Sequence, residues 1–357
     1  MDEPRHAPAK HVIGPILSKI GEISLNLRGL SAKLQVPILF PAAGAGHCGH
    51  PGGQGMSEMR QMNPTVLVAG ATGKFGKLVV PELVKRKAQV RALIRDASQE
   101  PLVRSLGASE VVRADLGHPD TLAPAVAGTN GVFFIGPAFA PDESTMGVAL
   151  VEAATRGGVR KFVYSSVIQP TNATLKNHAS KIPVETALYN SRLDYTILHP
   201  ANFMQNIAFA WAGIIASGTF AEPFPATARL AKVDYRDVAE TAAIALTGDS
   251  LSYATLELSA GMYDRIEIAK IISEELGRPI EAAEVSFDAW VAKARLPYDE
   301  QALALLAKVH AHYRAFGLGG NALTLKAALG REPRSMRTYI RDLIAAQSQS
   351  TVSGARA

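Results

Sequence analysis

The sequence predicts an α/β protein with a doubly wound parallel sheet and a smaller C-terminal lobe. Short apolar runs alternate with helical periodicities from Pro64 to about Pro200, which is the pattern of parallel strands joined by crossover helices. The first apolar run is followed directly by a glycine-rich turn, Gly70-Ala71-Thr72-Gly73-Lys74-Phe75-Gly76. A turn of this kind between the first strand and the first helix is typical of dinucleotide-binding sheets. We therefore expect a Rossmann-type fold.

Strands are expected where apolar runs are short, and helices where apolar residues recur with a period of 3.6. The predicted strands of the sheet are residues 65–69, 89–94, 110–113, 131–135, 161–165 and 195–198. The helices between them are predicted at residues 74–87, 100–106, 121–126, 144–156 and 180–191. Because strands and helices alternate, neighbouring strands are expected to run parallel.

After Pro200 the alternation becomes irregular. Helices are predicted at residues 202–216, 235–246, 265–276, 299–316 and 335–346, with a strand at residues 254–258. We expect these segments to form a small substrate lobe at the carboxyl-terminal edge of the sheet. Residues 61–346 would then make up the nucleotide-binding domain with its lobe, and the polar residues 347–357 a frayed tail.

Residues 1–60 differ in composition from the rest of the chain. They carry Pro, Gly and His in irregular order, which is typical of a disordered extension. The alternative interpretation is a start further along the chain, at Met56, Met59 or Met62. Each of these methionines precedes the first predicted strand by a few residues.

The composition is that of a globular protein. The 357 residues are 47% hydrophobic and 19% charged, and the formal net charge is +5. The basic residues are scattered, so direct nucleic-acid binding is not expected. No apolar run has the length of a membrane span and no signal pattern is found, so we expect a cytoplasmic protein without a membrane partner.

The single cysteine, Cys48, lies between His47 and His50 in a Gly-rich stretch, where we predict no metal site.

The glycine turn predicts how a dinucleotide is held. Glycine tolerates a positive φ, and the lack of a side chain lets a pyrophosphate approach the backbone. A helix that begins near Lys74 would direct its free N–H groups and the positive end of its dipole toward the phosphates. The candidate cofactor-binding residues of the turn are Gly70, Thr72, Gly73, Lys74, Phe75 and Gly76.

The end of the second strand selects between NAD and NADP. An acidic residue at this place binds the ribose hydroxyl of NAD, and an arginine accommodates the 2′-phosphate of NADP. The sequence has Arg95 followed by Asp96. A guanidinium group forms two-pronged contacts with phosphate, and Lys74 adds a charge nearby. NADP(H) is therefore the favoured cofactor, and NAD(H) stays open because of Asp96.

Several segments together resemble the NmrA-like branch of the atypical short-chain dehydrogenases/reductases. The matching segments are residues 68–76, 91–96, 113–116, 161–166, 193–206 and 329–333, and the resemblance covers residues 64–344. It implies a third-strand segment beside the adenine and a loop after the sixth strand whose Asn202 and Phe203 contact the nicotinamide. The cofactor-binding residues that it adds are Asp115, Leu116, Gly136, Ser165, Lys181, Pro200, Asn202 and Phe203.

The same resemblance places Lys181 where related dehydrogenases have their catalytic lysine. Those enzymes hold a tyrosine four residues earlier as the acid–base group, but this chain has Asn177 there. Lys181, alone or with a water, is therefore the first catalytic candidate. His178 is the second, as a proton relay near neutral pH, with a surface or capping residue as the alternative. Glu185 is expected to pair with Lys181.

Two functions follow from the resemblance. The first is an NADPH-dependent reductase that passes hydride to a small apolar acceptor such as a quinone, an enone or an azo compound. The apolar run 203–215, with Trp211, would wall the substrate site; a core helix is the alternative. The second function is a non-catalytic NADP(H) redox sensor that regulates a protein partner such as a transcription factor, which Asn177 favours. The family contains proteins of both kinds, and the enzyme is the preferred prediction. A third, less favoured option is a dinucleotide-binding subunit, such as an assembly factor for a larger complex.

Overall fold

The structure is a computed structural model, and it describes residues 63–294 and 296–354. The predictions for residues 1–60, the Cys48 segment included, lie outside this part of the chain. Within these residues, none of the helices combines the length and the apolar character that a membrane crossing needs.

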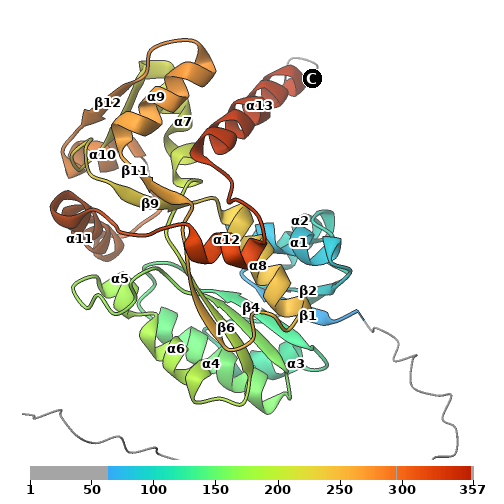
Figure 1. Cartoon of the computed structure of the whole chain (residues 1–357). Coiled ribbons are helices and arrows are strands. Elements are labelled where there is room, and N and C mark those ends of the chain that lie inside the picture. Colours follow the sequence, from blue (N-terminus) through green and yellow to red (C-terminus); the bar gives the residue numbers. More distant parts are fainter. Residues whose placement is uncertain (1–62, 295, 355–357) are drawn as a thin grey trace, which may run out of the picture. The chain divides into compact units, whose positions relative to one another are not determined.

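A seven-stranded parallel sheet forms the centre of the fold (Figure 1). Its strands are β1 (Thr65–Ala69), β2 (Gln89–Ile94), β3 (Glu110–Arg113), β4 (Gly131–Ile135), β5 (Lys161–Ser165), β6 (Asp194–Pro200) and β10 (Ala254–Leu258). They pair in the order β10-β6-β5-β4-β1-β2-β3, and every pairing is parallel. The predicted Rossmann-type doubly wound sheet is thereby confirmed.

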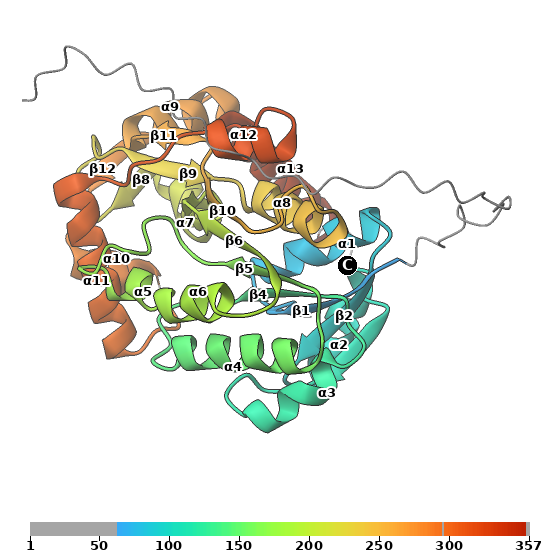
Figure 2. The same ribbon diagram turned by 60° about the horizontal axis from the view of Figure 1, so that its bottom comes forward.

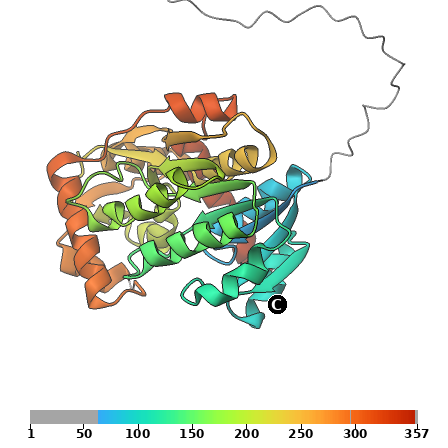
Figure 3. The same ribbon diagram turned by 90° about the horizontal axis from the view of Figure 1, so that it is seen from below.

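Helices cover both faces of this sheet, each over its own apolar core. One face carries α1 (Val79–Lys85), α2 (Glu100–Ser105), α8 (Tyr235–Thr247) and α12 (Leu323–Leu329). The other face carries α3 (Leu122–Val126), α4 (Glu143–Arg156) and α6 (Ile182–Tyr189). Figure 2 shows the sheet between α4 and α8, and in Figure 3 the green helices α4 and α6 lie across the near face.

The remaining elements form a smaller C-terminal lobe. They are β7 (Asn202–Phe203), α7 (Asn206–Ser217), β8 (Thr219–Glu222), β9 (Leu230–Val233), β11 (Gly261–Tyr263), α9 (Arg265–Leu276), β12 (Glu281–Glu284), α10 (Phe287–Ala294), α11 (Glu300–Phe316) and α13 (Met336–Gly354). The lobe has its own core, in which Trp211 and Ile214 of α7 pack against Ile272 of α9 and Ile340 of α13. The part of the run 203–215 that carries Trp211 and Ile214 therefore corresponds to the core-helix alternative, whereas Phe209 is 53% exposed.

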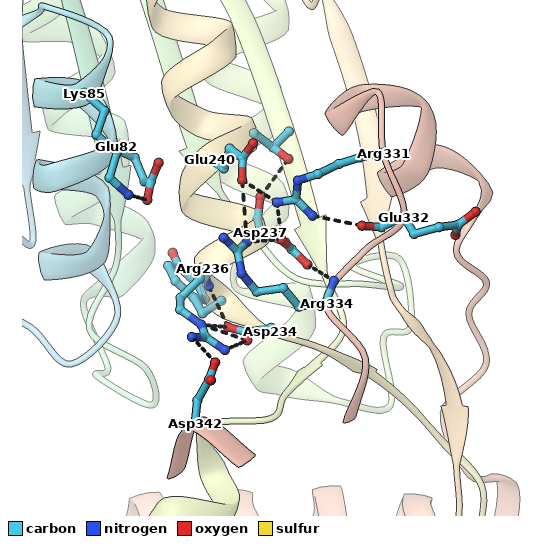
Figure 4. A network of polar contacts seen from close by, with 12 residues as sticks. Glu82, Lys85, Asp234, Arg236, Asp237, Glu240, Arg331, Glu332, Arg334 and Asp342 are labelled. Atoms are coloured by element: carbon cyan, nitrogen blue, oxygen red, sulfur yellow. Dashed lines mark hydrogen bonds and ion pairs between the residues drawn. The ribbon is translucent and has the colours of Figure 1, made fainter. Parts of the chain in front are cut away.

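Charged side chains join α8 to the segment that leads into α13 (Figure 4). Asp237 is fully buried and accepts hydrogen bonds from Arg331 Nη2 at 2.7 Å and from the Arg334 amide at 2.7 Å. It also pairs with the Arg334 guanidinium. One buried carboxylate thus holds two arginines of the connection between α12 and α13.

Several predicted helix bounds are wrong for identifiable reasons. The glycine turn delays the first helix, so that a 3₁₀ helix spans Gly76–Leu78 and α1 begins only at Val79. The helix predicted at 180–191 is the shorter α6, which begins at Ile182 because Pro183 occupies the first turn, and a separate short helix, α5 (Lys176–Ala179), precedes it. The helix predicted from residue 202 begins at Asn206, since Asn202–Phe203 pairs with β9. The last helix continues past residue 346 to Gly354.

Candidate functional site

The glycine turn after β1 brings backbone segments into close approach at the switch point of the sheet. Here β4 returns to the side of β1, and its last residue is Ile135. Gly70 has a φ of +97°, and a Cβ atom on it would lie 2.8 Å from Ile135 Cγ2. A Cβ atom on Gly76 would lie 2.2 Å from the Gly70 carbonyl oxygen. Only glycine fits these two positions.

The turn also leaves several backbone donors free. The Gly73 amide donates to the Gly70 carbonyl at 2.9 Å and so closes the turn. Among the residues that the structure describes, no acceptor is recorded for the amides of Thr72, Lys74, Phe75 and Gly76. Clustered free amides are the donors that a phosphate group needs. The turn therefore fits a pyrophosphate, although these donors precede α1 rather than belong to its first turn.

Arg95 and Asp96 follow β2 and are both exposed, but only one of them has a free side chain for a ligand. The Asp96 carboxylate caps the next 3₁₀ turn by accepting from the Ser98 amide at 2.8 Å, and these hydrogen bonds lower its pKa. The hydrogen bond of Arg95 comes from its backbone amide, which donates to Gln99 Oε1 at 3.0 Å. Its guanidinium group is therefore the free side chain among these two residues. Arg113, in register with Ile94, is a second exposed cation at this end of the sheet.

Asp115 and Leu116 lie just beyond β3, where the resemblance places the adenine. The Asp115 carboxylate accepts from the Gly117 amide at 2.9 Å and pairs with His118 at 3.3 Å. The Gly117 hydrogen bond, together with the positive charge of Arg95, lowers the pKa of Asp115. Asp115 is thus ionised and near Arg95.

Lys181 lies at the start of α6 and pairs with a carboxylate that the sequence did not single out. Its Nζ forms an ion pair with Glu143, in the first turn of α4, and Glu143 is 1% exposed. A Cβ atom on Gly136 would lie 2.5 Å from Glu143 Oε1, so this glycine makes room for the pair. The pairing of Lys181 with Glu185 was therefore a wrong prediction.

Glu185 instead forms a second buried cluster. Its Oε1 accepts from Ser166 Oγ at 2.5 Å and lies 2.9 Å from His199 Nε2. Ser166 follows β5 and His199 belongs to β6, so the carboxylate ties together the carboxyl ends of two strands. The neighbouring Ser165 accepts from Tyr235 Oη at 3.0 Å, and burial raises the pKa of that tyrosine.

His178 lies on α5 and is 2% exposed. Its Nδ1 has no hydrogen-bond partner in the described part of the chain. Burial, with the charge of Lys181 as a smaller cause, lowers the pKa of His178 to about 4. The imidazole is neutral at pH 7, which differs from the predicted relay near neutral pH and from the surface alternative.

The predicted nicotinamide-side loop begins at the buried Pro200 and is partly engaged by protein contacts. The Phe203 ring packs on Phe75 of the glycine turn, with ring centroids 4.4 Å apart, and on Tyr235 at 4.8 Å. Asn202 accepts from Lys232 Nζ at 2.9 Å. The loop therefore links the glycine turn to the C-terminal lobe.

Taken together, the predicted cofactor residues follow the carboxyl ends of β1 to β6. Lys74 belongs to the same edge, but its Nζ lies 3.8 Å above the centre of the Phe209 ring on α7. The residues that sequence reasoning did not assign to the site are Glu143, Ser166, His199, Lys232 and Tyr235. No local pattern marks them, because their partners are distant in sequence. Among the described residues, no cluster of three His, Cys, Asp or Glu side chains is placed to bind a metal.

Comparisons with known proteins assign the chain to a family. The model of the NmrA-like family matches residues 62–340. An NAD(P)H azoreductase of Xenophilus azovorans is 29% identical over 235 residues, covering 62% of this chain and 78% of the relative. A (4-alkanoyl-5-oxo-2,5-dihydrofuran-3-yl)methyl phosphate reductase of Streptomyces griseus is 31% identical over 230 residues, covering 63% and 78%.

The fold is also similar to a solved structure of NmrA, a negative transcriptional regulator, in complex with NADP. The TM-score is 0.66 at 16% identity, and the match covers 81% of this chain and 98% of that structure. At this identity the likeness concerns the fold. The sequence relatives and this structural neighbour thus include both reductases and a regulator.

Proposed function

Since the chain belongs to the NmrA-like family, we propose that it is an NADPH-dependent reductase. It would transfer hydride to a small apolar acceptor such as a quinone, an enone or an azo compound. The observation that carries the proposal is the glycine turn. Its free amides, and the two positions 70 and 76 that admit only glycine, fit a pyrophosphate. The two reductases among the relatives support the choice of reaction.

The protein's own groups would position the reactants and supply charge. When bound, the dinucleotide supplies the hydride. The turn amides hold the phosphates, and Arg95 pairs with the 2′-phosphate. Lys181 lies at the start of α6, where it would bind the ribose and deliver a proton. Glu143, buried beneath it, is a positioning residue that keeps the ammonium group in place.

Replacing the arginine tests the cofactor assignment. Arg95→Gln is expected to weaken NADPH binding by about 10- to 100-fold, because a hydrogen-bonded pair with a charged group contributes about 1.5–3 kcal/mol. NADH binding should stay unchanged, since NADH has no 2′-phosphate. Fluorescence titration with both cofactors measures this, and the exposed Arg192→Gln is the matched control. Equal weakening of NADPH and NADH would contradict the assignment.

Replacing the lysine tests the reaction. Lys181→Met is expected to lower kcat by about 100-fold or more, the usual contribution of a positioned acid–base group. NADPH affinity should fall much less, because the phosphate contacts are intact. Stopped-flow oxidation of NADPH with quinone and azo acceptors measures the step, and Lys176→Met removes an exposed lysine of α5 as a control. A variant with wild-type kcat on every acceptor would rule out the role of Lys181.

Asn177 favours a second candidate, a redox sensor without turnover. Its position lacks the phenol that related dehydrogenases use, and the NmrA structure shows that this fold also serves a regulator that binds NADP. A sensor must distinguish NADP⁺ from NADPH, since a ligand shifts an equilibrium only by its differential affinity. Equal affinities together with turnover would exclude the sensor.

A further inference from the structure

A buried lysine of the C-terminal lobe lacks a carboxylate partner among the described residues. Lys232 lies on β9, is 3% exposed, and pairs in register with Asn202 of β7. Its Nζ donates to Asn202 Oδ1 at 2.9 Å, and this is the acceptor recorded for it within the part of the chain that the structure describes. An ammonium group has three protons, so two of them have no acceptor among the described residues.

The carboxylate whose charge acts on Lys232, Glu222, forms its ion pair with a neighbouring buried cation. Arg265 is 2% exposed and lies 3.4 Å from Glu222 Oε2. Its other nitrogens donate to the carbonyls of Ala283 at 2.5 Å and Phe224 at 2.8 Å. Glu222 therefore serves two buried cations: it pairs with Arg265, and its charge also acts on Lys232, whose pKa is lowered on balance by burial and by Arg265. Lys232 has no ion pair of its own among the described residues. Buried charges without a partner are costly, and functional sites are where such charges are retained.

An aromatic wall adjoins this charge. The ring of His310 on α11 is surrounded by four others, with centroids 4.9 to 6.1 Å away, those of Phe224, Phe287, Trp290 and Tyr313. His310 Nδ1 is buried and has no hydrogen-bond partner among the described residues. Burial, with the charges of Arg265 and Lys232 as smaller causes, lowers the pKa of His310 to about 4, so its ring is neutral.

Asn202 connects the wall, the charge and the cofactor loop. Its Nδ2 lies 3.4 Å from the Tyr313 hydroxyl, while its Oδ1 accepts from Lys232. The next residue, Phe203, packs on Phe75 of the glycine turn. A group bound beside Lys232 would thus lie close to the loop that the proposed function assigns to the nicotinamide.

We propose that Lys232 binds a negatively charged substituent of the acceptor, a carboxylate, sulfonate or phosphate, and so defines the substrate class as planar aromatic anions. The aromatic wall contacts the flat part of the acceptor, and Asn202 orients the lysine. This inference rests on the proposed reductase function for its location. The lack of an ion pair at Lys232 itself follows from the contacts of Lys232 and Arg265.

A matched pair of azo compounds tests this. Methyl red carries a carboxylate that 4-dimethylaminoazobenzene lacks, and the two are otherwise alike. Wild-type kcat/KM should be at least about tenfold higher for methyl red, and Lys232→Met should bring the ratio close to one, mainly through KM. Lys270→Met removes a lysine from the exposed surface of α9 and should leave the ratio unchanged.

Binding without turnover gives an independent measurement. The chain has two tryptophans, so Trp211→Phe leaves Trp290, whose ring lies 4.9 Å from that of His310, as the single reporter. In the presence of NADP⁺, quenching should show a Kd at least about tenfold lower for methyl red than for the neutral compound. Asn202→Asp keeps the lysine but gives it a carboxylate partner, and should therefore also abolish the difference in Kd between the two compounds. Thermal unfolding of each variant verifies the fold.

Each outcome decides between the proposals. Equal binding of both compounds by the wild-type chain, or a preference that survives Lys232→Met, overturns the inference while the reductase proposal stands. An equal loss of kcat on both compounds would assign Lys232 to proton transfer and also overturns it. Charge-dependent binding without any turnover supports the anion site and rejects the reductase.

Discussion

Gly76→Ala is expected to weaken NADPH binding by about 100-fold or more. The new Cβ atom would lie 2.2 Å from the Gly70 carbonyl oxygen and 2.8 Å from its carbon, and both are backbone atoms. The turn must therefore open, which moves the free amides away from the phosphates. Misplacement of a binding group by about 1 Å is sufficient for an effect of this size. Calorimetric titration of the variant with NADPH and NADP⁺ measures the loss.

A second glycine supplies the control for this substitution. Gly213 lies inside α7, where an added Cβ atom would meet Lys293 Cε at an ordinary 3.6 Å. Gly213→Ala should leave the Kd for NADPH unchanged and stabilise the chain by about 0.5–1 kcal/mol, because alanine loses less entropy in a helix. Tight NADPH binding by Gly76→Ala would show that the turn does not hold the cofactor.

Asp237→Asn is expected to lower the free energy of unfolding by about 3 kcal/mol, the lower end of the range for breaking a buried ion pair. The carboxylate is fully buried and accepts from both Arg331 and Arg334. An amide in its place presents N–H donors to those guanidinium groups. The expected loss of unfolding free energy stays at the lower end of that range because the side chains of Arg331 and Arg334 are 36% and 28% exposed. Water can therefore hydrate them once the ion pairs are lost. Urea unfolding followed by circular dichroism measures the change.

An exposed ion pair provides the comparison. Glu152 and Arg156 lie one turn apart on α4 at 3.5 Å, with side chains 58% and 69% exposed. Glu152→Gln removes the same charge as Asp237→Asn and should leave the urea midpoint unchanged, since exposed pairs contribute little. Equal midpoints for both variants would mean that the network in Figure 4 does not stabilise the connection to α13.

The sheet could be predicted because its strands are four to seven residues long and bounded by turn signals. β7, with two residues, and β9, with four, carry no such signal. Their pairing depends on a partner about 30 residues away in the chain, as the contact between Asn202 and Lys232 shows. Short strands of this kind are specified by tertiary contacts and not by periodicity.

The candidate site divides in the same way. The glycine turn is local, so its spacing alone predicted where a dinucleotide fits. The partner of Lys181 was misjudged, because helical spacing favoured Glu185, four residues later. Glu143 lies 38 residues earlier and meets Lys181 only once β4 and β5 are neighbours. Pro183, by starting a new helix, leaves Glu185 to pair with His199.

The chain does not finish the sheet before it builds the lobe. It leaves after β6, forms α7, β8 and β9, returns for α8 and the edge strand β10, and leaves again. The lobe is therefore not a separable unit at the end of the chain. Cutting the chain at Pro200 would also remove the edge strand β10 and the helices α8 and α12 that cover the sheet. Exchanging acceptor specificity between relatives by recombination would require several coordinated crossovers. With the role proposed for Lys232, new specificities are more readily reached by point substitutions at such places, with the backbone left intact.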